Sequence, residues 1–159
     1  MSVDYEHPSI RNVVATLADR GAVGRVRVLP DSARTAAEAA AALGCDVGAI
    51  ANSLVFDAAG EPLLVLTSGA HRVDTVRLAS ALGLPELSRA APEFVRSATG
   101  QAIGGVAPVG HPNRLRTVVD RALAEHQVVW AAAGHPHAVF PTGYEELLRI
   151  TDGEPADVG

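Results

Sequence analysis

Two short apolar runs on either side of a tight turn constrain the fold more than any other part of this sequence. Residues 52–56 (NSLVF) and 62–67 (PLLVLT) are rich in branched side chains, and Asp57-Ala58-Ala59-Gly60 lies between them. Runs of this kind around a glycine-containing turn are typical of an antiparallel β-hairpin. We therefore expect a hairpin that lies centrally in a sheet.

Helices are predicted around this hairpin from apolar spacing, capping residues and glycine stops. Thr35 with Glu38, and Thr142 with Glu145, have the spacing of capping boxes at helix starts. The predicted helices cover residues 9–21, 35–44, 74–83, 92–100 and 142–148.

Further strands are predicted at residues 25–29, 115–119, 128–132 and 138–140. Strands and helices do not alternate regularly, which argues against repeated βαβ units. We expect a mixed α/β fold, with a largely antiparallel central sheet surrounded by helices. The whole chain, residues 1–159, is predicted to be one domain with an ordered core at about 9–151, and the polar tail from Asp152 is expected to fray.

The basic residues restrict the chemistry, because all 13 of them are arginine and none is lysine. Schiff-base chemistry and a Walker-type phosphate loop both need a lysine and are therefore excluded. The net charge of −5 argues against a broad electrostatic grip on nucleic acid, and DNA is not an expected partner. Any RNA contact should be small, directed at an RNA end, and made by a local arginine patch.

Composition also favours a cytoplasmic protein. No apolar stretch approaches the roughly 18 residues of a membrane helix, so a membrane is not an expected partner. The first ten residues lack the basic-then-apolar order of a secretory signal. Cys45 is the single cysteine, which suits a reducing compartment, and it has no basic neighbour in sequence that would activate it.

One loop combines features that suit ligand binding. Residues 101–113 hold three glycines and two prolines. Gly104 and Gly105 allow close approach of the backbone, and Pro108 stiffens the far side. Free N–H groups in such a loop can hold an oxyanion or a carbonyl oxygen. A tight crossover turn between strands explains the same residues, so both interpretations stay open.

Histidines form a second candidate. His135 and His137 share one face if their segment is extended. His111 lies in the glycine–proline loop of residues 101–113. Three histidines can bind zinc, but no Asp, Glu or Cys lies close to them in sequence. Polar loop histidines are the simpler interpretation, so no metal is expected, and His135 is a candidate for contacting a substrate.

Arg72 is a third candidate, in the segment that follows the second hairpin run. Its guanidinium can meet a phosphate, or it can pair with Asp74 at the start of a helix. The sequence does not choose between these roles. A serine-centred nucleophile elbow and a zincin motif are both absent from the sequence.

Several runs, taken in order, resemble the YbaK/prolyl-tRNA-synthetase-associated family, in particular its free-standing, ProX-like branch. The resemblance covers roughly residues 9–151, and the order and spacing of the runs make it specific. The matching runs are TAAEAA (35–40), IANSLVF (50–56), LVLTSG (64–69), IGGVAPVG (103–110), AAGHPHAVF (132–140) and EELL (145–148).

This resemblance implies a mixed sheet wrapped by helices and a trans-editing activity. Members of the family hydrolyse the ester of mischarged tRNA, typically Ala-tRNA(Pro) or Cys-tRNA(Pro). The loop from Gly104 to Pro108 would hold the aminoacyl carbonyl while water attacks, helped by the ribose 2′-hydroxyl. No metal, other cofactor or covalent intermediate is implied. The implied partners are the acceptor end of aminoacyl-tRNA and prolyl-tRNA synthetase.

At one position the chain departs from the family pattern. Where the family usually has a lysine, this chain has Asn52, which can hydrogen-bond a phosphate or ribose but carries no charge. The expected catalytic residues are Asn52, Gly104 and Gly105, and the expected substrate-binding residues are Arg72, Pro108 and His135. Two functions follow: a deacylase in which Arg72 supplies the missing charge, or a non-catalytic relative that binds aminoacyl-tRNA or a small amino-acid derivative.

Overall fold

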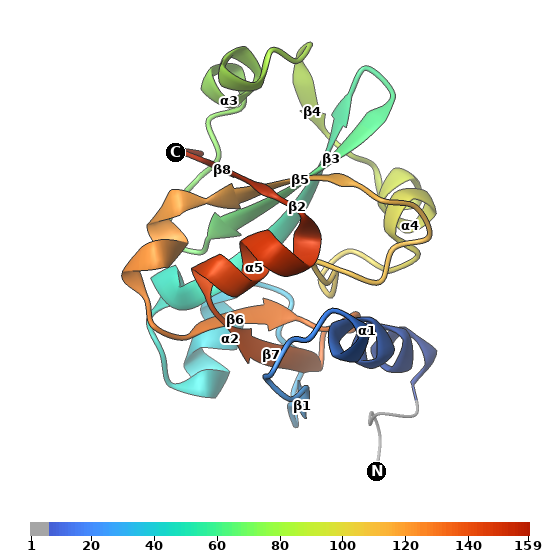
Figure 1. The fold of residues 1–159 in the computed structure, drawn as a ribbon, viewed down its shortest axis with the longest axis vertical. Helices are drawn as coiled ribbons and strands as arrows, with labels where there is room; N and C mark the ends of the chain where they lie inside the picture. Colours follow the sequence, from blue (N-terminus) through green and yellow to red (C-terminus); the bar gives the residue numbers. More distant parts are fainter. Residues whose placement is uncertain (1–6) are drawn as a thin grey trace.

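Residues 7–159 are described in a computed structural model as a mixed α/β fold (Figure 1). The helices are α1 (Pro8–Asp19), α2 (Ala36–Leu43), α3 (Thr75–Leu82), α4 (Pro92–Thr99) and α5 (Tyr144–Thr151), with short 3-10 helices η1 (Val47–Ala49) and η2 (Arg121–Glu125). The strands are β1 (Arg27–Val28), β2 (Ile50–Ala58), β3 (Glu61–Ser68), β4 (Leu87–Arg89), β5 (Arg116–Asp120), β6 (Val129–Ala132), β7 (Ala138–Thr142) and β8 (Glu154–Ala156).

The predicted hairpin is confirmed as β2 and β3. The two strands pair antiparallel from Ala51–Ser68 to Ala58–Glu61. The turn places Ala59 and Gly60 at positive φ, and the Gly60 N–H donates to the Asp57 carboxylate over 2.6 Å. The aspartate and the glycine of the turn are therefore the residues that close the hairpin.

The sheet is mixed, as predicted, with the hairpin at its centre. Its strand order is β1-β7-β6-β2-β3-β5-β8, and β4 also pairs with β2. The pairs β1/β7, β6/β7, β2/β3 and β2/β4 are antiparallel, whereas β2/β6, β3/β5 and β5/β8 are parallel. The hairpin therefore has a parallel neighbour on each side, β6 beside β2 and β5 beside β3.

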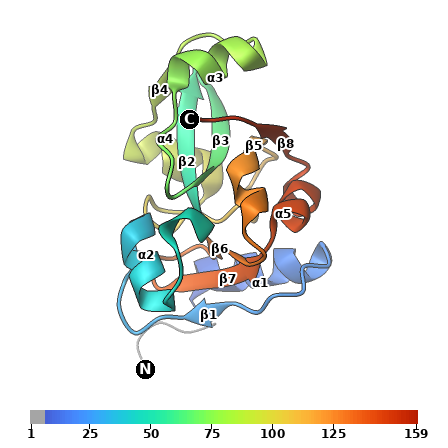
Figure 2. The ribbon, with the colours of Figure 1, turned by 90° about the vertical axis from the view of Figure 1, so that its left-hand side faces the viewer.

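Side chains that alternate along β3 enter two separate cores. Leu64 and Leu66 pack with residues of α1 and α5, whereas Leu63 and Val65 pack with Leu78 of α3. This is the period of two that a strand covered on both faces requires. Figures 1 and 2 accordingly show α3 at one end of the molecule and α1 at the other.

The first capping box is confirmed, and the second is wrong. Thr35 accepts from the Glu38 N–H while the Glu38 carboxylate accepts from the Thr35 N–H. Thr142, by contrast, is the last residue of β7 and pairs with Val129. Because strand pairing holds Thr142 in extended backbone, α5 begins after Gly143 with no side-chain cap.

The expectation of a frayed tail is also wrong. Residues 154–156 form β8 against β5, and Val158 is buried beside the cluster that includes Leu63 and Val65. The Asp74 N–H donates to the Val158 carbonyl over 2.7 Å. Two small apolar residues, Ala156 and Val158, therefore anchor a segment whose composition is otherwise polar.

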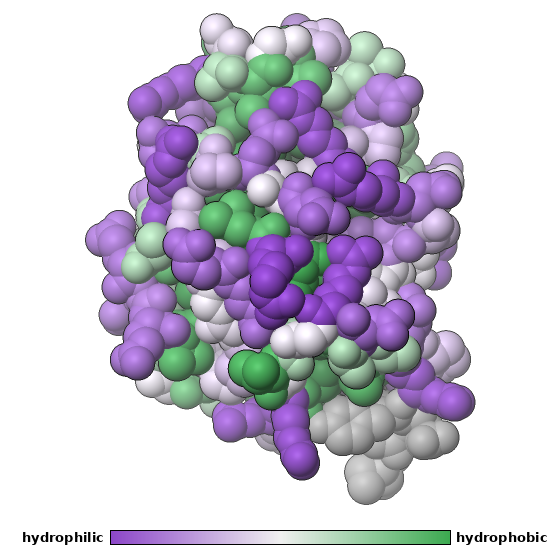
Figure 3. Space-filling model, viewed as in Figure 1, coloured by the Kyte–Doolittle hydropathy of each residue, from purple (hydrophilic) through white to green (hydrophobic). Residues whose placement is uncertain are grey.

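The surface seen in Figure 3 is mostly polar, with apolar patches between the polar side chains. Within residues 7–159, no helix has the length and apolar character needed to cross a membrane.

Candidate functional site

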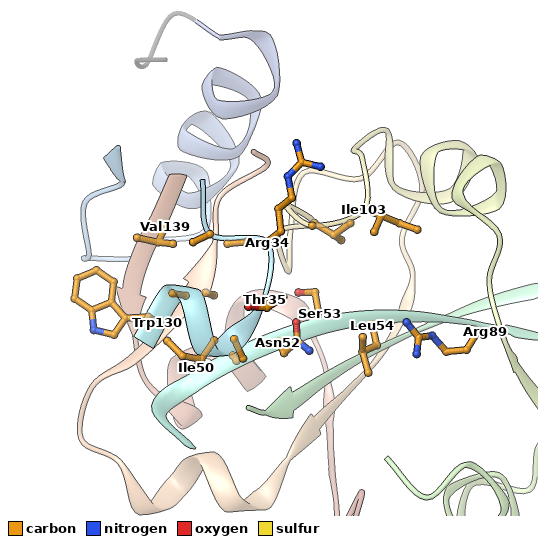
Figure 4. A pocket seen from close by; sticks show the side chains of 18 residues that line it. Arg34, Thr35, Ile50, Asn52, Ser53, Leu54, Arg89, Ile103, Trp130 and Val139 are labelled. Carbon is orange, nitrogen blue, oxygen red and sulfur yellow. The ribbon is translucent and has the colours of Figure 1, made fainter. Parts of the chain in front are cut away.

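A pocket of about 250 Å³ lies between α2, β2, β6 and the loop that carries Gly104 (Figure 4). Most of its wall is alanine and branched aliphatic side chain. The polar side chains on the wall are those of Arg34, Thr35, Asn52, Ser53 and Arg89.

The pocket occupies a gap in the sheet. On one side of β2, β6 pairs only at Ile50 and Ala51, and β4 pairs only from Phe56 onward. Between those partners no strand lies beside β2 in the described part of the chain. The sheet topology therefore leaves a short length of strand edge facing the cavity.

The glycine–proline loop contributes residues to the wall of this pocket, and two of its backbone N–H groups have no acceptor in the described chain. The Gly105 N–H donates to the Ala102 carbonyl over 3.2 Å, and the Ala107 N–H donates to the Gln101 amide oxygen over 2.7 Å. The N–H groups of Gly104 and Val106 meet no acceptor within residues 7–159, and both residues line the pocket. Gly104 and Val106 thus line the pocket and carry N–H groups that have no protein acceptor in the described chain.

The side chain of Gln101, which sequence reasoning did not single out, braces this loop. Gln101 is 3% exposed, its amide nitrogen donates to the Val109 carbonyl over 3.2 Å, and its backbone N–H donates to the Thr99 hydroxyl. With the bond from Ala107, one buried amide therefore spans both halves of the loop. In the sequence, the only indication of this role is that a glutamine stands at the start of a glycine-rich segment.

Gly105 has a packing role that differs from the predicted one. A Cβ at this position would lie 2.6 Å from the carbonyl carbon of His135, and Gly105 does not line the pocket in the described chain. Its lack of a side chain lets two loops touch. Gly104, at φ +96°, does line the pocket, so the two adjacent glycines have different roles.

His135 lies beside the pocket rather than in its wall. It lines an adjacent cavity of about 310 Å³ that shares Arg34 and Ile103 with the pocket. Its Nδ1 accepts from the His137 N–H over 3.1 Å, so the neutral ring carries its proton on Nε2. Burial, with the neighbouring His7, lowers the pKa of His135 below its usual value. His135 therefore offers a neutral N–H donor.

His111 and Pro108 lie elsewhere, on a second cavity of about 520 Å³ on the far side of the same loop. The His111 Nε2 bonds the Ala107 carbonyl over 2.8 Å. Among residues 7–159, no three His, Cys, Asp or Glu side chains are grouped as metal ligands. The structure does not bring His111, His135 and His137 together.

Arg72 does not line the pocket, and the alternative role considered for it, a pairing with Asp74, is not formed among the described residues. Asp74 instead caps α3 by accepting from the Arg77 N–H over 3.1 Å. The guanidinium groups at the pocket are those of Arg34 and Arg89, which sequence reasoning missed. They come from a loop and a short strand that only the tertiary structure brings together.

Asn52, predicted as a catalytic residue, lines the pocket. Its side chain is on the wall beside Thr35 and Ser53 (Figure 4), and its amide makes no hydrogen bond within residues 7–159. An amide without a protein partner on the wall of a pocket is available to a ligand as both donor and acceptor.

The structure is that of a mixed α/β domain with a small pocket at an edge of its central hairpin. The aminoacyl-tRNA editing domain family matches residues 30–150, and the chain belongs to this family. It is 44% identical to a proposed trans-editing enzyme for prolyl tRNA synthetase of known crystal structure. That match covers 99% of this chain and 98% of the other, with a TM-score of 0.89.

Two proline–tRNA ligases are also similar. The ligase of Nitratidesulfovibrio vulgaris (strain DP4) is 33% identical over 155 residues, which cover 90% of this chain and 27% of the ligase. The ligase of Geobacter sulfurreducens is 30% identical over 132 residues, which cover 77% of this chain and 23% of the ligase. The chain thus spans about a quarter of the length of these relatives.

Proposed function

We propose that this chain is a trans-acting deacylase that hydrolyses mischarged aminoacyl-tRNA of the Ala-tRNA(Pro) or Cys-tRNA(Pro) type. The observation that carries the proposal is that Gly104 and Val106 line a small pocket and that their N–H groups meet no acceptor within residues 7–159. Membership of the aminoacyl-tRNA editing domain family supports it.

In the proposed reaction, the Gly104–Pro108 loop holds the carbonyl of the aminoacyl ester. Water attacks the carbonyl carbon, negative charge develops on the carbonyl oxygen, and the loop N–H groups stabilise that charge. The ester C–O bond then breaks, and the ribose 3′-oxygen leaves with a proton relayed by the neighbouring 2′-hydroxyl. The products are the free amino acid and uncharged tRNA, and the residues of this chain position the groups without forming a covalent intermediate.

The pocket suits a small side chain. Its wall includes Ala33, Ala36, Ala131 and Ala132, and its volume is about 250 Å³. Discrimination between small apolar side chains is limited, because one methylene is worth about 1–3 kcal/mol. Alanine and cysteine are therefore both reasonable substrates, and a panel must decide between them.

Three exposed arginines form the proposed contact with the acceptor end. Arg34 and Arg89 line the pocket, and Arg96 lines the adjacent cavity with Arg34. None of the three forms an ion pair within residues 7–159. They can therefore meet the last phosphates of the tRNA without first breaking a bond.

A non-catalytic aminoacyl-tRNA binder is the second candidate. Asn52 favours it, because a neutral amide stabilises developing charge less than the lysine that the family usually has at this position. In both proposals the partner is the aminoacyl end of tRNA, prolyl-tRNA synthetase is an expected associate, and the site of action is the cytoplasm.

A deacylation panel separates the two candidates. The protein is mixed with tRNA(Pro) charged with Ala, Cys, Ser or Pro, and release of the amino acid is compared with the uncatalysed rate. Faster release of Ala or Cys than of Pro is expected. Binding of the charged tRNA with no acceleration for any amino acid would contradict the deacylase and leave the binder.

A further inference from the structure

The sheet gap lies along the side of β2 that faces away from β3. In the described part of the chain, Ser53 is the residue of β2 at this gap whose backbone groups on that side meet no neighbouring strand. The Gly69 N–H donates to the Ile50 carbonyl, so even-numbered residues of β2 direct their N–H and C=O groups toward β3. Odd-numbered residues face the other way. Of these, Ala51 lies against β6, and the Val55 carbonyl accepts from the Ala90 N–H. Ser53 lies between them, at the gap.

The Ser53 side chain is also unsatisfied. Its hydroxyl oxygen is buried and makes no hydrogen bond within residues 7–159. A buried hydroxyl without a partner costs about 1–3 kcal/mol, and such groups are rare unless a ligand or a function explains them. Ser53 lines the pocket, near Thr35 and Asn52 (Figure 4). Within residues 7–159, the hydroxyl, the N–H and the carbonyl of Ser53 thus all lack protein partners, and Ser53 lines one cavity.

The chemistry of the wall indicates which ligand group these atoms suit. No Asp or Glu lines the pocket in the described chain. A positively charged amine that enters it must therefore be bound by neutral acceptors. The Ser53 carbonyl and hydroxyl oxygens are two such acceptors on one residue, and an ammonium group has three donors to share between them.

We propose that Ser53 recognises the free α-amino group of the bound aminoacyl residue through its carbonyl oxygen and its hydroxyl. This inference rests on the proposed function and deepens it: the site selects ligands with an unblocked amine. The aliphatic side chain of the ligand then lies against the alanine wall.

The test uses a probe that cannot be hydrolysed, so that binding is measured separately from catalysis. Adenosine that carries alanine through a 3′-amide, and the same compound with an acetylated amine, are titrated into the protein by calorimetry. We expect the free amine to bind at least about tenfold more tightly than the acetylated form. Ser53→Ala should reduce that preference severalfold while its Tm stays the same or rises, because an unsatisfied hydroxyl is removed.

Ser68→Ala is the matched control. Ser68 is a buried serine on the adjacent strand, and its hydroxyl donates to the Gly48 carbonyl over 2.8 Å. This variant should lose stability and keep the preference for the free amine. A fall in Tm for Ser53→Ala as large as that for Ser68→Ala would overturn the inference. So would equal binding of the two compounds, or an unchanged preference in Ser53→Ala. Protein that binds the free amine selectively but accelerates no deacylation would instead refute the deacylase and retain this inference.

Discussion

At the scale of single residues, the pocket is governed by which polar atoms lack a partner. Asn52, Ser53, Gly104 and Val106 all line one cavity, and the Asn52 amide, the Ser53 hydroxyl and the N–H groups of Gly104 and Val106 have no partner in the described chain. In a folded protein most buried polar groups are paired, so a cluster of unpaired ones marks a surface kept for a ligand.

The role of Asn52 is tested by restoring the family's charge. We expect Asn52→Lys to raise kcat/KM on the preferred aminoacyl-tRNA by about tenfold, because a charged hydrogen bond contributes about 1.5–3 kcal/mol against about 1 for a neutral one. Asn52→Ala should lower it. Thermal unfolding is measured alongside, because an unpaired ammonium on an apolar wall costs stability. If Asn52→Lys folds and is no faster, and Asn52→Ala matches the parent, position 52 is not part of the site.

The two adjacent glycines give a matched pair of variants. Gly105→Ala puts a Cβ 2.6 Å from the His135 backbone, so we expect the larger fall in Tm for this variant. Gly104→Ala places a Cβ 3.3 Å from the flexible Arg34 side chain, but an alanine does not readily keep φ +96°. The Gly104 N–H would then turn from the pocket, with an expected loss in kcat/KM of about 10²-fold or more. Equal activity per folded molecule in the two variants would exclude Gly104 as a donor.

At the scale of elements, the loop keeps its shape because Gln101 crosses it. Gln101→Met removes both side-chain hydrogen bonds and leaves the Ala107 N–H and the Val109 carbonyl buried and unpaired. We expect this variant to lose about 2–4 kcal/mol of unfolding free energy, measured by urea denaturation, and most of its deacylase activity. Gln127→Met, at an exposed position, should change neither quantity. A stable, active Gln101→Met protein would show that the backbone alone holds the loop.

At the scale of the whole molecule, the net negative charge opposes tRNA binding, whereas the local positive charge near the pocket favours it. The chain carries a net charge of −5, yet three unpaired arginines gather at the pocket and the adjacent cavity. We expect tRNA binding with a shallow salt dependence. Arg34→Ala or Arg89→Ala should each reduce the magnitude of the negative slope of log K against log salt by about 0.7. Arg72→Ala is the control. If the magnitude of the slope decreases only in Arg72→Ala, the RNA contact lies away from the pocket.

Stability of the whole molecule should fall in mild acid. Burial, followed by the nearby charge of Arg20, lowers the pKa of His111, and burial with the neighbouring His7 lowers that of His135. A histidine whose folded pKa is depressed binds protons less readily than in the unfolded chain. Its contribution is therefore complete above about pH 6.5 and is lost as the pH falls below that value. Unfolding free energies at about pH 7.5 and pH 5.5 should show the loss, and His111→Gln should reduce it.

The sequence by itself determined the central hairpin, the first capping box, the glycine-terminated helices and the family. Each of these depends on residues within a few positions of one another, or on the order of short runs along the chain. It also pointed to Asn52 and Gly104, which line the pocket in the structure. Local patterns failed at Thr142 and at the tail, where strand pairing and two buried side chains overrode the composition.

Only the tertiary structure decided the rest of the site. The gap beside β2 exists because β6 and β4, from distant parts of the chain, pair with different ends of one strand. The same packing brings Arg34 and Arg89 to the wall of one pocket and leaves Arg72 outside it. It also leaves the Ser53 hydroxyl without a hydrogen-bond partner in the described chain. Whether a polar atom is satisfied depends on what folds against it, and no local pattern in a sequence records that.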